Sequence, residues 1–120
     1  MNYKKEIQNI IEQSTFTYVR QREMLGLGHA ILTGEPLIGN EPFAVLLADD
    51  FLTDYDPGVT ADLVDAFGKT GNSQLSVMPV DEAYISQYGV IIPTADGHGV
   101  IGVVEKPRQE EAPSNLASIG

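Results

Sequence analysis

Two adjacent carboxylates, Asp49 and Asp50, follow directly on an apolar run, and their placement points to chemistry. The run, Phe43 to Ala48, contains no polar residue and is rich in strand-forming types, so it predicts a strand buried on both faces. In open α/β sheets, ligands bind beyond the carboxyl ends of the strands. A carboxylate there suits a hard cation such as Mg²⁺, which in turn suits a phosphate-bearing substrate. Taken alone, the pair is more typical of solvated carboxylates after a strand.

A second pair of charged residues, Glu105 and Lys106, ends a later apolar segment just before Pro107. Lys106 is one of the cations that an anionic substrate would need in so acidic a chain. The competing interpretation is an ordinary pair of charges at the end of a strand.

Glycines flank Leu27 in the segment GLGHA, which lies between a predicted strand and a predicted helix. Glycine lets the backbone approach a ligand closely, so Gly26 and Gly28 are candidate binding positions. The segment lacks the further glycine of a dinucleotide fingerprint, and on sequence pattern alone a plain tight turn is the favoured interpretation. The histidines His29 and His98 are far apart in the sequence, and we assign neither a catalytic role.

The elements that must position these residues follow from periodicity and turn signals. Helices are predicted at Tyr3–Gln13, Leu27–Thr33 and Ala61–Thr70, the last with Thr60 as N-cap and Gly71 as C-cap. Strands are predicted at Thr15–Arg20, Phe43–Ala48, Gln74–Val80, Tyr88–Pro93, Val100–Glu105 and Ser114–Gly120. Helices between strands imply parallel pairing, and the turn Thr94–Gly99 implies a hairpin. We therefore expect an α/β fold with a mixed, mainly parallel sheet and a late β-hairpin.

The composition narrows the class of protein. With 120 residues, 42% of them hydrophobic, the chain is long enough for a single domain. No segment is long enough to cross a membrane, and the absence of cysteine is compatible with a cytoplasmic location. The net charge of −10 argues against nucleic-acid binding. An anionic substrate would need local cations, from Arg20, Arg22, Lys106 or bound Mg²⁺.

Several segments in order along the chain carry a resemblance to a known family: YVRQREMLGLGHAI, PFAVLLADDF, YGVI, GVVEKP and APSNLA. Together they resemble the bacterial UTP–glucose-1-phosphate uridylyltransferases, or UDP-glucose pyrophosphorylases, from about Val19 to Gly120. The resemblance implies part of a Rossmann-like nucleotide-diphospho-sugar transferase core, with residues 1–120 as one partial domain. It also implies Mg²⁺-dependent joining of UTP to glucose 1-phosphate, which yields UDP-glucose and pyrophosphate.

The resemblance also implies roles for individual residues. Gln21 matches a position that hydrogen-bonds uracil, and Gly28, with Gly26 in the same turn, matches backbone that lies against the base. Asp49 matches the metal-binding aspartate, which makes it the expected Mg²⁺ ligand, while Asp50 is expected to be solvated. On the sugar side, the matching residues are Gly89 as a sugar contact, Glu105 for the hydroxyls and Lys106 for the phosphate. The motifs favour uridine over thymidine, and they leave open which hexose is bound.

Parts of the family pattern have no counterpart in this sequence. They are the glycine-rich triphosphate loop of the GLGTR type and a second metal-binding aspartate beyond SNLA. We therefore expect these 120 residues alone to be inactive. The alternative is a catalytically dead module that binds a sugar nucleotide or forms oligomers. An unpaired edge at the strand beginning at Thr15 or Phe43 predicts a homo-oligomer.

Overall fold

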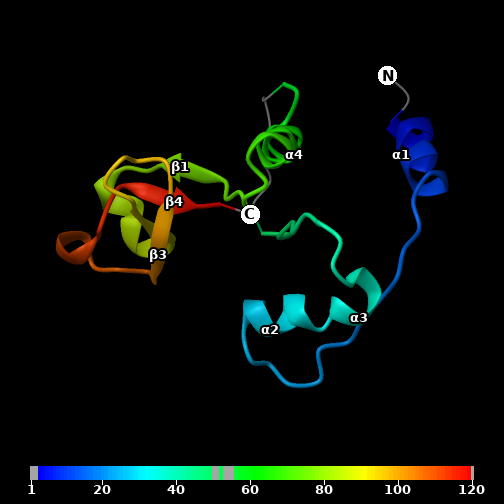
Figure 1. Ribbon diagram of the computed structural model, residues 1–120, viewed down its shortest axis with the longest axis horizontal. Coiled ribbons are helices and arrows are strands. Elements are labelled where there is room, and N and C mark those ends of the chain that lie inside the picture. The colour runs from blue at the N-terminus through cyan, green and yellow to red at the C-terminus, as the bar shows by residue number, and fades with distance from the viewer. Residues whose placement is uncertain (1–2, 50–51, 53–55, 120) are drawn as a thin grey trace. The chain divides into compact units, whose positions relative to one another are not determined.

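The computed structural model describes residues 3–49, 52 and 56–119 of the chain (Figure 1). The chain divides into two units, Met1–Phe43 and Ala44–Gly120, and each is described by itself. Two residues used in the sequence predictions, Asp50 and Gly120, lie outside the described residues.

The first unit contains three helices: α1 (Tyr3–Glu12), α2 (Leu27–Leu32) and α3 (Glu35–Ile38). The first two confirm the predictions from helical periodicity. The third lies in a segment with two prolines and two glycines for which no helix was predicted. It forms because Pro36 stands in the first turn, where a proline costs no hydrogen bond, and Gly39, at a φ of 63°, ends the helix.

Two strand predictions are wrong for the described residues, namely Thr15–Arg20 and the apolar run Phe43–Ala48. Neither segment is assigned to a strand, and their large side chains are exposed, with Tyr18 at 90% and Leu46 at 70%. Strand-forming residues favour an extended backbone, but a strand also needs a neighbour that completes its ladder of hydrogen bonds. No described segment pairs with either of these two.

The second unit begins its regular structure with the helix α4 (Val59–Thr70). The helix begins at Val59, one residue before Thr60, and its N-cap is Gly58. The prediction of Thr60 as the N-cap is therefore wrong. Gly71 is the predicted C-cap, with a left-handed φ of 68° that glycine adopts without strain. Leu63 and Phe67 are half-buried along the predicted apolar face.

The sheet of the second unit comprises β1 (Val77–Pro79), β2 (Gly89–Pro93), β3 (Val100–Glu105) and β4 (Leu116–Ser118) in the order β1-β4-β2-β3 (Figure 1). Short 3₁₀ helices, η1 (Glu82–Gln87) and η2 (Gln109–Glu111), connect them. All pairings among the described strands are antiparallel, which corrects the expectation of a mainly parallel sheet. The short connection between β2 and β3 permits only antiparallel pairing, as predicted for the hairpin.

The hairpin loop between β2 and β3 is held by hydrogen bonds to the side chains of Thr94 and Asp96. The backbone N–H of Gly99 donates to Thr94 Oγ1 at 2.8 Å. Asp96 Oδ1 accepts from the Thr94 hydroxyl and from the backbone N–H of His98. These hydrogen bonds, that from Thr94 foremost, hold the pKa of Asp96 below its ordinary value.

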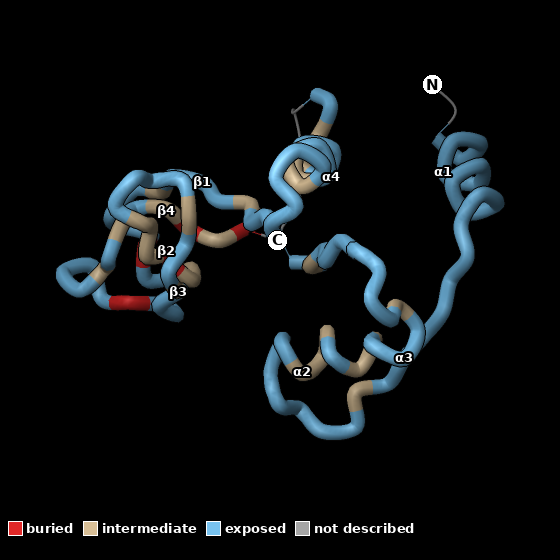
Figure 2. The backbone as a smooth tube through the Cα atoms, viewed as in Figure 1, coloured by how far each residue is buried: buried red, intermediate tan, exposed pale blue. Residues whose placement is uncertain are grey.

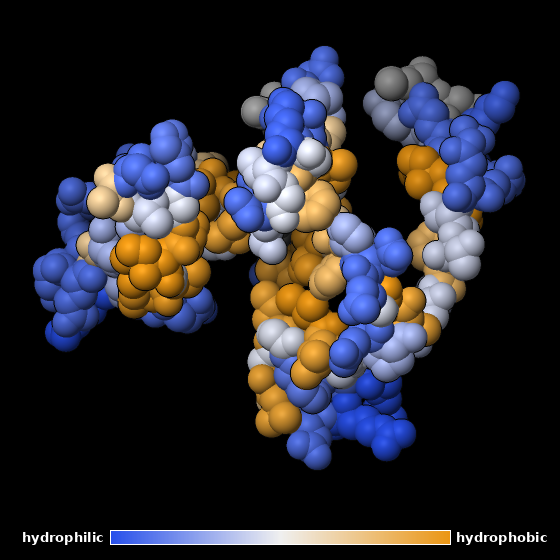
Figure 3. All heavy atoms as spheres, in the orientation of Figure 1, coloured by the Kyte–Doolittle hydropathy of each residue, from blue (hydrophilic) through white to orange (hydrophobic). Residues whose placement is uncertain are grey.

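The buried core lies in the second unit (Figure 2). Its buried hydrophobic residues come from η1, β2 and the β4 region: Ile85, Val90, Ile91, Ala117 and Ile119. Apolar side chains also reach the surface of this unit, including Ile101 and Val103 of β3, at 71% and 51% exposure (Figure 3). In the first unit, by contrast, no described residue is buried.

Candidate functional site

In the first unit, the side chain of Gln21 closes the turn that leads into α2. Its Nε2 donates to the carbonyl of Gly26 at 3.2 Å and lies 2.9 Å from Nδ1 of His29. Gly26 has a φ of 90°, a conformation that favours glycine, and this turns the chain so that its carbonyl faces Gln21. The same carbonyl accepts the N–H of Ala30 at 3.1 Å and so starts the helix. One glycine therefore links the helix start to the predicted base-contacting side chain.

Gly28 lies in the first turn of α2 and presents bare backbone. A Cβ placed on it would meet no atom within 4 Å. The helix therefore does not need glycine here for space, and the position leaves room for a flat ligand against the chain. The structure thus places Gly26 and Gly28 at the start of α2, and it places Gln21 in contact with the carbonyl of Gly26.

Asp49 lies in the second unit after the extended apolar run, and it is exposed. Within the described ranges, no group of three or more potential metal-ligating side chains occurs. A single carboxylate is compatible with Mg²⁺, because that ion usually keeps several waters and takes one or two carboxylates together with substrate phosphates. The carboxylate of Asp49 therefore fits the predicted ion.

The predicted sugar-contacting residues come together at one end of the β2–β3 hairpin. Gly89 pairs with Glu105 in the register of the two strands. A Cβ on Gly89 would lie 3.1 Å from Glu105 Oε2 and 3.2 Å from Val103 Cγ1. Since a side chain at position 89 would crowd both neighbours, glycine there leaves the Glu105 carboxylate its place beside the strand.

Lys106 directly follows β3 in a left-handed conformation, with a φ of 47°. Its backbone N–H donates to the carbonyl of Tyr88 at 3.0 Å, which fixes the chain at this bend. Its Nζ lies 3.8 Å from Glu105 Oε1, and both side chains are largely exposed. A non-glycine residue with this backbone carries strain of about 1–2 kcal/mol. Such strain is common at functional positions, which agrees with the predicted role of Lys106.

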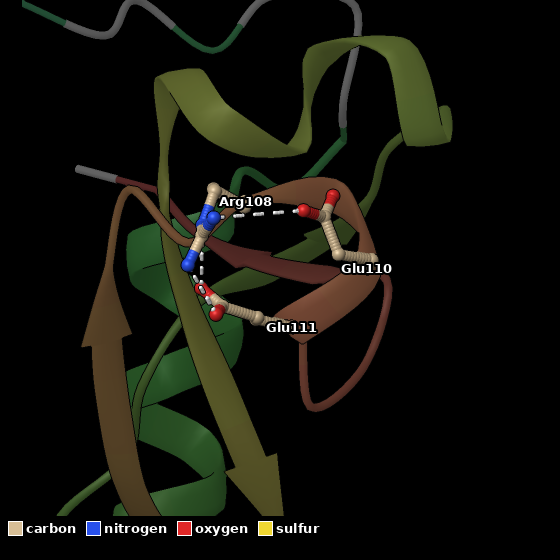
Figure 4. A network of polar contacts seen from close by, with 3 residues as sticks. All are labelled: Arg108, Glu110 and Glu111. Carbon is tan, nitrogen blue, oxygen red and sulfur yellow. Dashed lines mark hydrogen bonds and ion pairs between the residues drawn. The ribbon is translucent and has the colours of Figure 1, made fainter.

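The charge of Arg108, two residues further along the chain, is compensated by Glu110 and Glu111 (Figure 4). Its Nε and Nη2 donate to the carboxylate of Glu111 at 3.1 and 2.7 Å, and its Nη1 lies 3.9 Å from Glu110. A guanidinium engaged by two carboxylate oxygens has little tendency to leave them. Lys106, held only by the longer contact with Glu105, is the better placed of the two to meet an anion.

The structure thus places the predicted site residues in separate groups. Gln21, Gly26 and Gly28 form one group in the first unit, and Gly89, Glu105 and Lys106 form another in the second, with Asp49 separate in sequence from both. Sequence analysis missed the contact of His29 with Gln21. The available signal was the position of this histidine in the first turn of the helix that Gly26 begins.

Comparisons with known proteins identify the family to which the chain is similar. The model of the nucleotidyl transferase family matches residues 1–120. A UTP–glucose-1-phosphate uridylyltransferase of Pseudomonas aeruginosa is 47% identical over 122 residues, which cover 98% of this chain and 44% of that protein. One from Staphylococcus epidermidis is 44% identical over 119 residues, which cover 97% of this chain and 41% of that protein. The chain therefore spans less than half the length of these relatives.

Solved structures show the same likeness in three dimensions. A UDP-glucose pyrophosphorylase complexed with UDP-glucose is 51% identical, with a TM-score of 0.87, and the match covers 97% of this chain and 46% of that one. A UTP-bound enzyme of this type from Acinetobacter baumannii is 29% identical, with a TM-score of 0.79, over 98% of this chain and 46% of that one. The resemblance drawn from short motifs and the expected α/β fold class are both confirmed. In the described part of the chain, every helix is too short or too polar to cross a membrane.

Proposed function

The chain belongs to the nucleotidyl transferase family, and from this premise we propose that it forms part of a UTP–glucose-1-phosphate uridylyltransferase. The reaction joins the phosphate of glucose 1-phosphate to the α-phosphorus of UTP and releases pyrophosphate. The observation that carries the proposal is the grouping of Gly89, Glu105 and Lys106 at one end of a hairpin. Residues 1–120 would be one partial domain of that enzyme, which the family match over the same residues supports.

The residues at the end of the hairpin suit a sugar phosphate. The Glu105 carboxylate can accept hydrogen bonds from two neighbouring hydroxyls, and bare backbone at Gly89 lets the ring approach. The exposed ammonium of Lys106 can neutralise a phosphate. In phosphoryl transfer, much of the rate enhancement comes from alignment and charge neutralisation of this kind, without a protein nucleophile. We propose Lys106 and Asp49 as the catalytic residues on this basis.

The turn before α2 suits the nucleotide. Gln21 offers an amide for the edge of a uracil ring, while Gly26 and Gly28 leave backbone open to its face. A uridine nucleotide such as UTP or UDP-glucose is the ligand that this group would take, as the relatives' names indicate for those proteins.

Asp49 would hold Mg²⁺ through its carboxylate. When bound, the ion supplies neutralisation of phosphate charge, which this acidic chain needs, since its net charge is −10. The chain's own contribution at this position is one exposed oxygen donor. The proposal for the metal rests on that donor and on the family.

We further propose that these 120 residues alone release no pyrophosphate at a meaningful rate, because they span less than half the length of the active relatives. A second candidate function, an oligomerising or sugar-nucleotide-binding module, is favoured by the exposed apolar side chains on the edge strand β3. Light scattering would detect the homo-oligomer that this second function predicts, and a monomer would count against it. A cytoplasmic location without nucleic-acid partners remains part of the proposal, from the absence of cysteine and the acidic charge.

The proposed function is tested by titrating the isotope-labelled chain with UDP-glucose, with and without Mg²⁺, while amide NMR shifts are recorded. Binding should shift Gln21, Gly28, Gly89, Glu105 and Lys106. The variant Lys106→Ala should weaken binding about tenfold, the scale of one charged hydrogen bond.

The matched control is Lys69→Ala, which removes the same charge from α4, where Lys69 pairs with Asp65. It should leave the affinity unchanged. Equal effects of the two substitutions would mean that Lys106 acts only through net charge, and this would overturn its assigned role.

A further inference from the structure

The contacts of Gln21 use one end of its side-chain amide. The nitrogen carries two protons and has no acceptor capacity, whereas the oxygen only accepts. Nε2 faces the carbonyl of Gly26 at 3.2 Å, which identifies it as the donor end, and it lies 2.9 Å from His29 Nδ1. Because an amide nitrogen can only donate, His29 Nδ1 must be the acceptor, with its ring proton on Nε2.

Of the two partners, His29 holds Gln21 more closely. The Gly26 carbonyl is shared, since it also accepts the N–H of Ala30 at 3.1 Å, and its distance to Gln21 is the longer one. Both His29 and Gln21 are half-buried, so the contact between them is partly protected from water, whereas the contact with Gly26 is exposed. A His29 ring with a proton on Nδ1 would donate instead, and it would favour the opposite orientation of the Gln21 amide.

We propose that His29 is a positioning residue that fixes the orientation of the Gln21 side-chain amide. In that orientation, only the acceptor atom Oε1 of Gln21 faces a bound base. This inference rests on the proposed function, in which Gln21 contacts the nucleotide. Among the described residues, none donates to Oε1, so the atom is available to a ligand. An acceptor at this position selects a pyrimidine whose ring nitrogen carries a proton, as in uracil, over one whose ring nitrogen is an acceptor, as in cytosine.

The energetic asymmetry of hydrogen bonding makes this arrangement selective. A ring N–H of uracil satisfies Oε1, whereas the ring nitrogen of cytosine would face it with a second lone pair. A site built to pair one polar group discriminates strongly against an analogue that leaves the group unpaired. If the amide were free to rotate, it would present its N–H to cytosine and much of that discrimination would be lost.

The test compares the affinities of the chain for UDP-glucose and CDP-glucose in matched variants. His29→Leu removes the acceptor, and it should lower the ratio of the two affinities about tenfold. His29→Asn keeps an acceptor oxygen near the position of Nδ1, so it should keep the ratio within about threefold of the unmodified chain. A merely structural role for His29 would lower both affinities together and leave their ratio unchanged, which would overturn the inference.

A second measurement needs no ligand. Nitrogen NMR of the His29 ring should show Nδ1 without a proton, and His29→Leu should shift the side-chain N–H signals of Gln21. A proton on Nδ1 in the neutral ring would overturn the inference directly.

The variant Gln21→Ala separates failure of the inference from failure of the proposed function. Loss of UDP-glucose affinity in Gln21→Ala, with an unchanged affinity ratio in His29→Leu, overturns only the role of His29. No loss in Gln21→Ala, or no response of the unmodified chain to millimolar UDP-glucose, overturns the proposed nucleotide contact and the inference together. In the Gln21→Ala background, His29→Leu should have no further effect on the ratio.

Discussion

The two units of this chain hold their candidate binding residues in different ways. In Ala44–Gly120, the group around Gly89 stands on a hairpin whose strand β2 contains the buried residues Val90 and Ile91. In Met1–Phe43, no described residue is buried, and Gln21 is held by hydrogen bonds to Gly26 and His29. The group around Gly89 is thus supported by packing, and Gln21 is supported by local polar contacts.

This difference indicates which substitutions should displace the side chains of each group. Side chains supported by a packed sheet lose their positions only when the core is disturbed, because the strands keep the register. A turn held by a few half-exposed hydrogen bonds depends on the individual donor and acceptor, each of which contributes about 1 kcal/mol. Substitutions that disturb either the packing or the hydrogen bonds, but not both, test this explanation.

The largest effect is expected from Ile91→Ala in the core of the second unit. Ile91 is 4% exposed, and removing a buried isoleucine side chain to Cβ costs about 3 kcal/mol of unfolding free energy. Ile101→Ala on the partner strand is the control, because Ile101 is 71% exposed and should change the free energy by less than about 0.5 kcal/mol. Urea unfolding followed by circular dichroism measures both. Similar losses in the two variants would show that β2 does not carry the packing.

A smaller effect is expected from alanine at two glycines, one in each unit. Gly89→Ala places a methyl group 3.1 Å from Glu105 Oε2 and 3.2 Å from Val103 Cγ1, and it should cost about 1 kcal/mol and displace the Glu105 carboxylate. Gly28→Ala meets no atom within 4 Å and should stabilise the helix by about 0.5 kcal/mol. Both should weaken UDP-glucose binding in calorimetric titrations. Equal changes in stability would contradict the contrast between a crowded and an open position.

Lys106→Gly is expected to raise stability slightly and to remove a binding group. Glycine relieves the strain of the left-handed backbone at a φ of 47°, with a net gain of about 0.5 kcal/mol after its greater freedom in the unfolded chain. Lys106→Ala keeps the strain but loses the same ammonium. Thermal unfolding should therefore separate the two variants, while glucose 1-phosphate binding should weaken equally in both. A Lys106→Gly variant less stable than Lys106→Ala would rule out backbone strain at this position.

The smallest effect concerns the pH dependence of the hairpin loop. The pKa of Asp96 is lowered in the folded state by the hydrogen bonds from Thr94 and His98. Stability from this group is therefore present above the unfolded pKa of about 3.9, and it is lost as the pH falls through the lower folded value. The variant Asp96→Asn should therefore lose less unfolding free energy than the unmodified chain when the pH falls below about 4. If the unfolding free energy of Asp96→Asn falls with acidification as in the unmodified chain, this carboxylate does not contribute to the pH dependence.

Much of the second unit follows from sequence patterns. The strand at Val100–Glu105 was predicted with its observed bounds, and the hairpin turn Thr94–Gly99 and the C-cap Gly71 were found from turn and cap signals. These features depend on neighbours close in sequence, which a pattern contains. The expectation of a mainly parallel sheet was wrong, because strand propensity at Thr15–Arg20 and Phe43–Ala48 does not specify a partner strand, and no described segment pairs with either.

In the candidate site, too, some features could be predicted from the sequence and others could not. The motifs led to Gly89, Glu105 and Lys106, and the structure adds that Gly89 pairs with Glu105 in the register of the strands. The contact between Gln21 and His29 escaped prediction because it depends on the turn that Gly26 makes at its φ of 90°. Side chains eight positions apart meet there only because of that backbone geometry.

The central claim is that the candidate residues of each unit recognise a different chemical group, a uridine base for Gln21, Gly26 and Gly28 and a sugar phosphate for Gly89, Glu105 and Lys106. The most direct test titrates the labelled chain with UMP, with glucose 1-phosphate and with UDP-glucose, and follows the backbone amide shifts. The account predicts shifts confined to Gln21–Gly28 for UMP, shifts confined to Gly89 and Glu105–Lys106 for glucose 1-phosphate, and both sets for UDP-glucose. Shifts from all three ligands in a single unit, or none at millimolar concentration, would contradict it.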